Sequence, residues 1–142
     1  MKARFARRVW LLAALALAAL LIPAVSQAQT AVSTLLGTWT APPGGTVSNV
    51  VIGGGPGAYT IDVKAPCSPT PCDWGTRPLT IYAPSVSVPV GKIGSATYNQ
   101  GFAQRIVVVT AQDATAPFLR VDVYTKFTGG GRSNYATTQT LH

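Results

Sequence analysis

The sequence has few acidic residues and few side chains suited to catalysis. It contains four aspartates, no glutamate and two cysteines, and its single histidine, His142, is the last residue. A Ser-His-Asp or Cys-His site therefore lacks a base, and a closed zinc site lacks its four ligands. The glycine-rich run 53–57 has no Lys-Ser/Thr and opens no helix, which argues against a phosphate-binding loop. We expect no catalytic residue, no metal and no cofactor.

The first 28 residues are typical of a secretory signal peptide. Four basic residues precede an uncharged apolar run, 9–22, and small residues follow at 26–28. The run is too short to predict a membrane-spanning helix. We predict cleavage after Ala28, a secreted or periplasmic protein, and membrane contact only through the uncleaved signal.

The remaining chain, 29–142, carries little net charge. Loss of four basic residues with the signal lowers the formal net charge from +7 to +3. The remaining basic residues are dispersed, without a run of two, so no nucleic-acid-binding stripe is predicted. A chain of 114 residues suits a single domain with one core.

Both cysteines lie in one short segment, 67–75. Pro69 and Pro71 favour a non-helical loop between Cys67 and Cys72. We predict that a disulfide closes this loop, and an exported protein would retain it. Free thiols and a metal site are the alternatives, and the metal site lacks further ligands.

The residues that follow Cys72 predict a turn. Asp73 can accept a hydrogen bond from its own nearby backbone, and Gly75 tolerates a positive φ. Trp74, between them, is either a lid over the core or a surface anchor for a ligand.

The domain shows the alternating pattern of β-strands throughout. In 118–127, Leu119, Val121 and Val123 alternate with polar residues, which is typical of a half-buried strand. Turn residues separate eight such segments. The predicted strands are 35–41, 46–52, 59–64, 77–83, 86–90 (with an extension toward 98), 102–111, 118–127 and 133–141.

Short connections between strands favour antiparallel neighbours, and hence a meander. Eight strands in this order most simply close into an up-and-down barrel, because closure removes the exposed edges. We therefore predict an all-β, eight-stranded antiparallel barrel, with a two-sheet β-sandwich as the alternative.

The segment Gly37-Thr38-Trp39, at the start of the first strand, resembles the opening of calycin barrels of the lipocalin and avidin type. The resemblance implies that Trp39 packs across the closed end of a barrel. It also implies an arginine over the indole, with Arg132 as first choice and Arg120 as second. The chain departs from lipocalins in its shorter length, its local disulfide and the lack of a helix after the barrel. It lacks the biotin-contacting pattern of avidins.

Two further segments, 72–75 and 131–135, are similar to parts of small secreted bacterial proteins. This similarity implies a family but no activity.

Binding is the function class that these observations favour. A small barrel is either filled by its own side chains or holds one small ligand at its mouth. Functional side chains are then expected at strand ends, where aromatic residues and arginine are favoured anchors. The candidates are Trp74, Arg77, Tyr98, Arg132, Asn134 and Tyr135.

The predicted partner is a small molecule or another extracytoplasmic protein. Two alternatives remain. The calycin resemblance also implies an inhibitor of an exported protease, because some such inhibitors are lipocalin-like barrels with one disulfide. A hydrolase would need a pair of carboxylates, and the only pair on predicted strands is Asp62 and Asp122. Their place on the polar side of each strand is more typical of solvated outer-face charges.

Overall fold

The computed structural model describes residues 34–88, 90–112 and 115–142, which form nine β-strands. The predicted signal peptide, 1–28, lies outside the described residues. In the described part of the chain, no helix is long and apolar enough to cross a membrane. The strands are β1 (Gly37–Thr40), β2 (Asn49–Gly53), β3 (Thr60–Ala65), β4 (Cys72–Pro78), β5 (Thr80–Tyr82), β6 (Ile93–Asn99), β7 (Ala103–Gln112), β8 (Phe118–Phe127) and β9 (Tyr135–Leu141).

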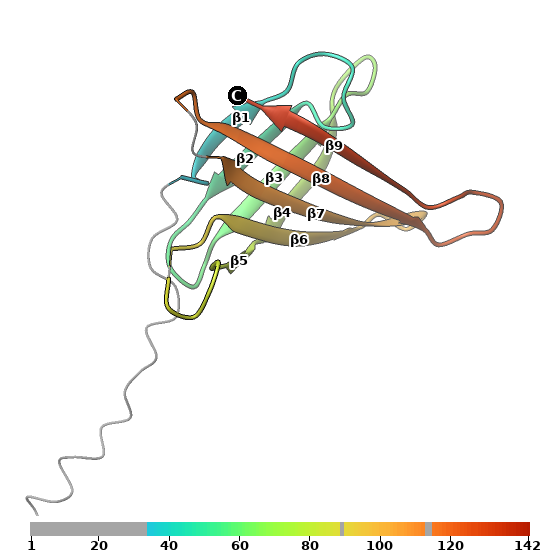
Figure 1. Ribbon diagram of the computed structural model, residues 1–142. Helices are drawn as coiled ribbons and strands as arrows, with labels where there is room; N and C mark the ends of the chain where they lie inside the picture. Colours follow the sequence, from blue (N-terminus) through green and yellow to red (C-terminus); the bar gives the residue numbers. More distant parts are fainter. Residues whose placement is uncertain (1–33, 89, 113–114) are drawn as a thin grey trace, which may run out of the picture.

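The strands form two antiparallel sheets in chain order (Figure 1). One sheet has the order β1-β2-β3-β4 and the other β5-β6-β7-β8-β9. This arrangement confirms the all-β fold and the sequential antiparallel pairing. The strands number nine and not eight, and their pairing in two sheets does not confirm a closed eight-stranded barrel.

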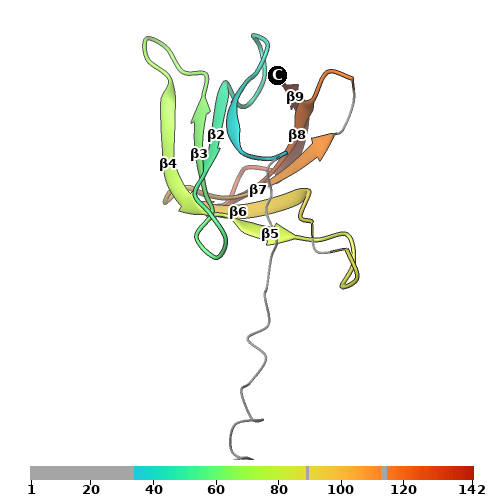
Figure 2. The ribbon, with the colours of Figure 1, turned by 90° about the vertical axis from the view of Figure 1, so that its left-hand side faces the viewer.

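The two sheets curve around a common interior (Figure 2). Buried side chains from both sheets form a single apolar cluster, which includes Val50 and Ile61 from the first sheet and Val107 and Val121 from the second. In β8, the predicted alternation is confirmed, because Leu119, Val121 and Val123 are all at most 1% exposed. Burial of each such side chain contributes about 1.5–3 kcal/mol.

A corner at Pro78 and Leu79 joins the two sheets. The prediction of one strand over 77–83 is wrong, because β4 ends at Pro78 and β5 begins at Thr80. Pro78 has no N–H to continue a ladder, and the N–H of Leu79 donates instead to the carbonyl of Tyr59 at 2.8 Å. This bond extends the pairing of Pro78 with Thr60 by one residue, and the chain then enters the second sheet at Thr80 while Leu79 stays in the core.

The strand predicted over 86–90 is also wrong. Among the described residues of this segment, an isolated bridge pairs Ser85 with Val88. The side chains of Val86, Val88 and Val90 are exposed. An alternating pattern without a core to cover it does not form a strand, and β6 begins only at Ile93.

The other ends of the two sheets meet between β1 and β9. Thr40 N–H donates to the carbonyl of His142 at 2.7 Å, and His142 N–H donates back to Thr40 at 3.0 Å. The side chain of Gln139 reinforces this junction. Its Oε1 accepts from the N–H of Val47 at 2.9 Å, and its Nε2 donates to the Val47 carbonyl at 2.7 Å.

Candidate functional site

The candidate site begins at the hairpin between β3 and β4. The predicted disulfide is confirmed: Cys67 and Cys72 are bonded, with their Cα atoms 5.3 Å apart. Because Ala65 pairs with Cys72, the bridge closes the loop of this hairpin. We call residues 66–72 the clasp.

The segment after Cys72 is strand and not the predicted turn, because β4 begins at Cys72. The expected local chemistry is nevertheless present, since Gly75 has φ +79° and its N–H donates to Asp73 Oδ1 at 2.7 Å. The register between β3 and β4 shifts here, as in a β-bulge. Bulges redirect side chains, and Trp74 lies inside the core, only 8% exposed.

Trp74 packs against Tyr98 from β6. Their rings meet edge to face, with centroids 5.7 Å apart. Tyr98 is fully buried and its hydroxyl donates to the carbonyl of Ile61 at 3.0 Å. Burial, together with the nearby Asp62 carboxylate, raises the pKa of the Tyr98 phenol. Arg77 lies 5.8 Å from the centre of the Tyr98 ring. Three of the six predicted binding residues therefore form one cluster.

The most unusual residue of this end is Arg105 in β7. Its guanidinium carbon lies 4.7 Å from the centre of the Trp74 ring and 5.4 Å from that of Phe102. Its Nε and Nη1 atoms are buried and find no hydrogen-bond acceptor among the described residues. Buried polar atoms without partners are rare and costly, so they mark candidate sites for a ligand.

Two more unpartnered buried atoms lie on the adjoining strands. They are the hydroxyl oxygens of Thr125 in β8 and Thr137 in β9. Arg105 pairs directly with Thr125 across β7 and β8, while Thr137 pairs with Val123, two residues along β8. Like their neighbours Val107 and Val123, these side chains follow the inward phase of their strands. We call Arg105, Thr125 and Thr137 the inner polar cluster.

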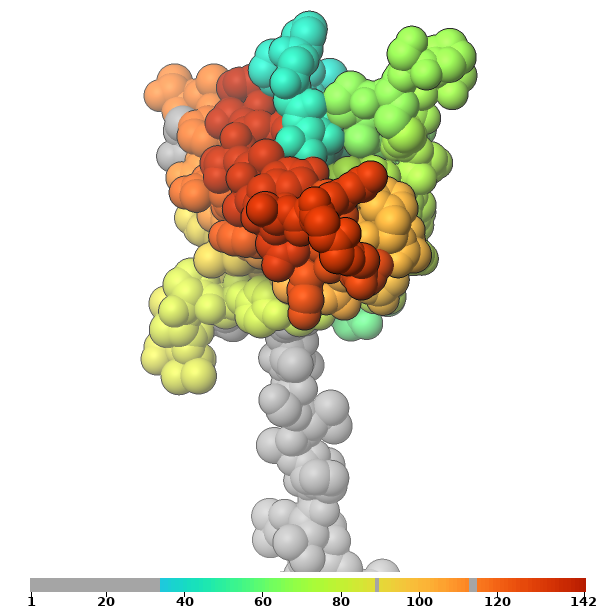
Figure 3. Space-filling model, turned by 90° about the vertical axis from the view of Figure 1, so that its right-hand side faces the viewer, coloured from blue at the N-terminus to red at the C-terminus, as the bar shows by residue number. Residues whose placement is uncertain are grey.

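A cleft of about 550 Å³ leads to Arg105. The clasp cysteines, Asp73 and Trp74 line one side, and Gln100, Phe102 and Arg105 line the other. Figure 3 views this end, where the turn between β6 and β7 (orange) lies below the clasp hairpin (green) and beside the connection from β8 to β9 (red). The volume lies within the range of small-molecule sites. We call it the clasp cleft.

The other three predicted binding residues gather around Phe127, in the connection from β8 to β9. The Arg132 guanidinium lies 5.2 Å from the Phe127 ring centre, and the Tyr135 ring lies 6.0 Å from it. Asn134 Oδ1 accepts from the N–H of Phe127 at 3.0 Å. These contacts stabilise the connection itself.

The predicted contact between Arg132 and Trp39 is wrong, because Arg132 stacks on Phe127. Trp39 is partly buried against the core, and its Nε1 donates to the carbonyl of Leu35 at 3.0 Å. Gly37, which precedes it, has φ +135°, a conformation that favours glycine. The second choice, Arg120, pairs with Asp122.

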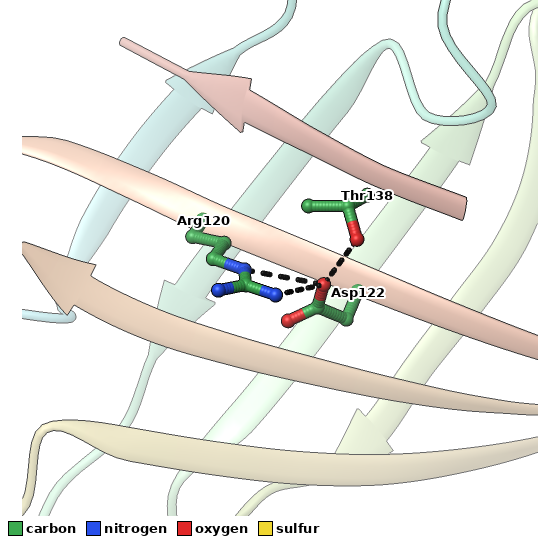
Figure 4. Close-up of polar contacts among 3 residues, drawn as sticks. All are labelled: Arg120, Asp122 and Thr138. Carbon is green, nitrogen blue, oxygen red and sulfur yellow. Dashed lines mark hydrogen bonds and ion pairs between the residues drawn. The ribbon is translucent and has the colours of Figure 1, made fainter. Parts of the chain in front are cut away.

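The two aspartates of the hydrolase hypothesis lie in different sheets. Asp62 in β3 accepts a hydrogen bond from Thr76 at 3.1 Å. Asp122 in β8 binds Arg120 at 3.0 Å and also accepts from Thr138 on β9 (Figure 4). The expectation that Asp122 is solvated is wrong. It is 8% exposed, because Arg120 and Thr138 cover it on the outer face.

Sequence reasoning missed Arg105, although a signal was present. In 103–111, Arg105 shares its phase with Ala103, Val107, Val109 and Ala111, all of which are buried. An arginine on the apolar side of a strand predicts either a buried charge or a functional site. Phe102, Thr125 and Thr137 were missed for a different reason, since each becomes notable only beside Arg105.

Comparison of the chain with protein-family models, curated proteins and solved structures finds no match. The calycin resemblance is therefore neither supported nor contradicted by these comparisons.

Proposed function

We propose that this protein is a non-catalytic binding protein that acts outside the cytoplasm and holds a small ligand in the clasp cleft. The observation that carries the proposal is Arg105, whose guanidinium has two buried nitrogen atoms without acceptors at the inner end of that cleft. Buried donor atoms that find no acceptor cost about 1–3 kcal/mol each. A ligand that supplies the missing acceptors would offset this cost.

The residues around the cleft favour binding over catalysis. A guanidinium stays protonated and acts as a donor, so Arg105 is suited to hold a ligand and poorly suited to be a base. Asp73 is the one carboxylate among the described residues of the cleft lining, and it already accepts from Gly75 N–H. Trp74 and Phe102 provide the flat apolar surfaces that small-molecule sites commonly have.

An extracytoplasmic location is part of the proposal. The Cys67–Cys72 disulfide supports it, because such bridges persist in oxidising compartments. The predicted signal peptide over 1–28 supports it independently of the bridge.

The proposal also includes a calycin-like barrel as the framework of the site. Two features support this closure: the reciprocal hydrogen bonds between Thr40 and His142, and the passage of the chain from β4 to β5 at the other junction. In such a barrel the clasp cleft would be the mouth.

Native mass spectrometry of the exported protein, purified from the organism that makes it, tests the proposed function. We expect a small molecule bound in a 1:1 ratio. The variant Arg105→Met should lose it, whereas the matched variant Arg120→Met, which changes an arginine on the outer face, should retain it. A protein without ligand in both variants and in the parent, and without any response to a broad metabolite library, would overturn the proposal. A stable complex with a protease would instead favour the inhibitor alternative.

A further inference from the structure

The inner polar cluster lacks hydrogen-bond acceptors. Nε and Nη1 of Arg105 carry three N–H donors between them, and all of them need acceptors. The hydroxyls of Thr125 and Thr137 can each donate a hydrogen bond as well as accept one. Oxygen acceptors on an anion in the clasp cleft would satisfy the Arg105 guanidinium, whereas an apolar molecule or a cation would leave it unpaired.

The charges at the clasp cleft limit how negative this anion is. Arg105 is the one cationic residue among the described residues that line the cleft, and the carboxylate of Asp73 lies in the same lining. A single guanidinium neutralises a monoanion. A dianion would bring a second negative charge into a partly buried site that already holds a carboxylate, which is costly.

The walls of the cleft indicate the rest of the ligand. Trp74 and Phe102 flank Arg105 with their rings. Aromatic walls beside one charged group suit a molecule with a carboxylate at one end and an apolar or planar body. A carboxylate is also the monoanion whose two oxygens match a guanidinium in geometry.

The Phe102 ring lies against Arg105 in the lining of the clasp cleft. The backbone of Phe102 is held by hydrogen bonds of its N–H to Gln100 and of its carbonyl to Thr128, but its side chain is 56% exposed. The ring lines the clasp cleft and also a neighbouring hollow of about 220 Å³ beside Phe127 and Arg132. We expect the ring to turn from one to the other at the cost of its cation–π contact with Arg105.

On the basis of the proposed function, we infer that the ligand is a small monocarboxylate with an apolar body. Its carboxylate binds Arg105 in the clasp cleft, and the Phe102 ring turns toward Phe127 to admit it.

Matched acid and amide probes test the ligand class. Benzoate and octanoate would be titrated against benzamide and octanamide, with sulfate as a dianion. The Trp39→Phe variant leaves Trp74 as the only tryptophan of 29–142, so that its fluorescence reports on the cleft. We expect at least one acid to bind about 10- to 100-fold more tightly than its amide, as a charge-assisted hydrogen bond predicts. This difference should vanish in Arg105→Met and persist in Arg120→Met.

Stopped-flow kinetics test the role of Phe102, because Phe102→Ala should accelerate association of the acid. An unchanged association rate would overturn the movement of the ring.

Equal binding of acid and amide, or tighter binding of sulfate, would overturn the monocarboxylate while the proposed function stands. If no probe binds and a molecule without a carboxylate co-purifies, the monocarboxylate is likewise overturned and the proposed function stands. Absence of both a co-purifying molecule and any probe binding would remove the proposed function itself.

Discussion

Along the inner face of the five-stranded sheet, the two ends of β7, β8 and β9 differ in chemistry. One end presents Val109, Leu119, Val121 and Leu141, all of which are fully buried. The other presents the inner polar cluster of Arg105, Thr125 and Thr137, with its four unpartnered atoms. The strands, the pairing and the alternation are the same at both ends, so only the residue types make the difference.

The apolar end of the sheet stabilises the fold, whereas the polar end is the part that we propose binds a ligand. At the apolar end, each buried aliphatic side chain contributes about 1.5–3 kcal/mol to folding. At the polar end, each unsatisfied group costs about 1–3 kcal/mol. The free protein thus gains its stability at one end and holds an unsatisfied site at the other. Four predictions test this contrast.

The largest effect is expected at the apolar end. Leu119→Ala should lower the free energy of unfolding by about 2–5 kcal/mol, because it leaves a cavity in a packed core. Ile106→Ala is the control, since Ile106 is 42% exposed on the outer face, and it should change stability by less than about 0.5 kcal/mol. Urea unfolding measures both. Similar values for the two variants would show that the apolar end is not the source of stability.

Removal of the disulfide should have an intermediate effect. The double variant Cys67→Ser and Cys72→Ser should lose about 2 kcal/mol without loss of the fold, because the bridge closes only a short loop. Hydrogen exchange should rise in β4 near the clasp and stay unchanged in β8 near Leu119. Uniform acceleration of exchange through both sheets would contradict this local role.

At the polar end, removal of charge should stabilise the ligand-free protein. Arg105→Met removes two buried nitrogen atoms that have no acceptor, which should stabilise the protein. It also removes the contact with the Trp74 ring, which should offset part of this gain. We expect a net gain of about 1 kcal/mol in thermal or urea unfolding. A loss of more than about 1 kcal/mol would mean that Arg105 supports the fold, and the contrast between the two ends would fail.

The smallest effect at neutral pH is expected for Tyr98→Phe, which removes the hydrogen bond to the Ile61 carbonyl and should cost about 1 kcal/mol. The pKa of Tyr98 is raised by folding, so its stabilising contribution is complete below the unfolded pKa of about 10 and is lost as pH rises through the folded pKa. The parent should therefore lose stability above about pH 10 more steeply than Tyr98→Phe. Parallel alkaline curves in urea unfolding would contradict this.

The sequence predicts the parts of the fold that depend on local pattern. The bounds of β8, 118–127, match the prediction because its alternation is uninterrupted and both of its neighbours are strands. The segment 86–90 has the same alternation, but its described residues form no strand, and its three valines have no core to cover. Pro78 was visible in the sequence, but the corner that it makes depends on the hydrogen bond from Leu79 to the carbonyl of Tyr59, which lies beside β3 and is distant in the chain.

The candidate site was only partly predictable. Trp74, Arg77 and Tyr98 were named from their residue types and do lie together, whereas Arg132, Asn134 and Tyr135 form a separate cluster around Phe127. Residue type indicates which side chains are able to bind, but it does not indicate which of them already have partners.

By itself, the sequence determined the β-class of this protein, the disulfide loop and the phase of the most regular strand, β8, because these depend on contacts within a few residues. The tertiary structure alone decided that Arg105, Thr125 and Thr137 adjoin and remain unsatisfied. It also decided that Trp74 and Phe102 flank the guanidinium. The physical reason is that hydrogen-bond satisfaction is a property of neighbours in space, and Trp74, Thr125 and Thr137 come from strands distant from Arg105 in the chain.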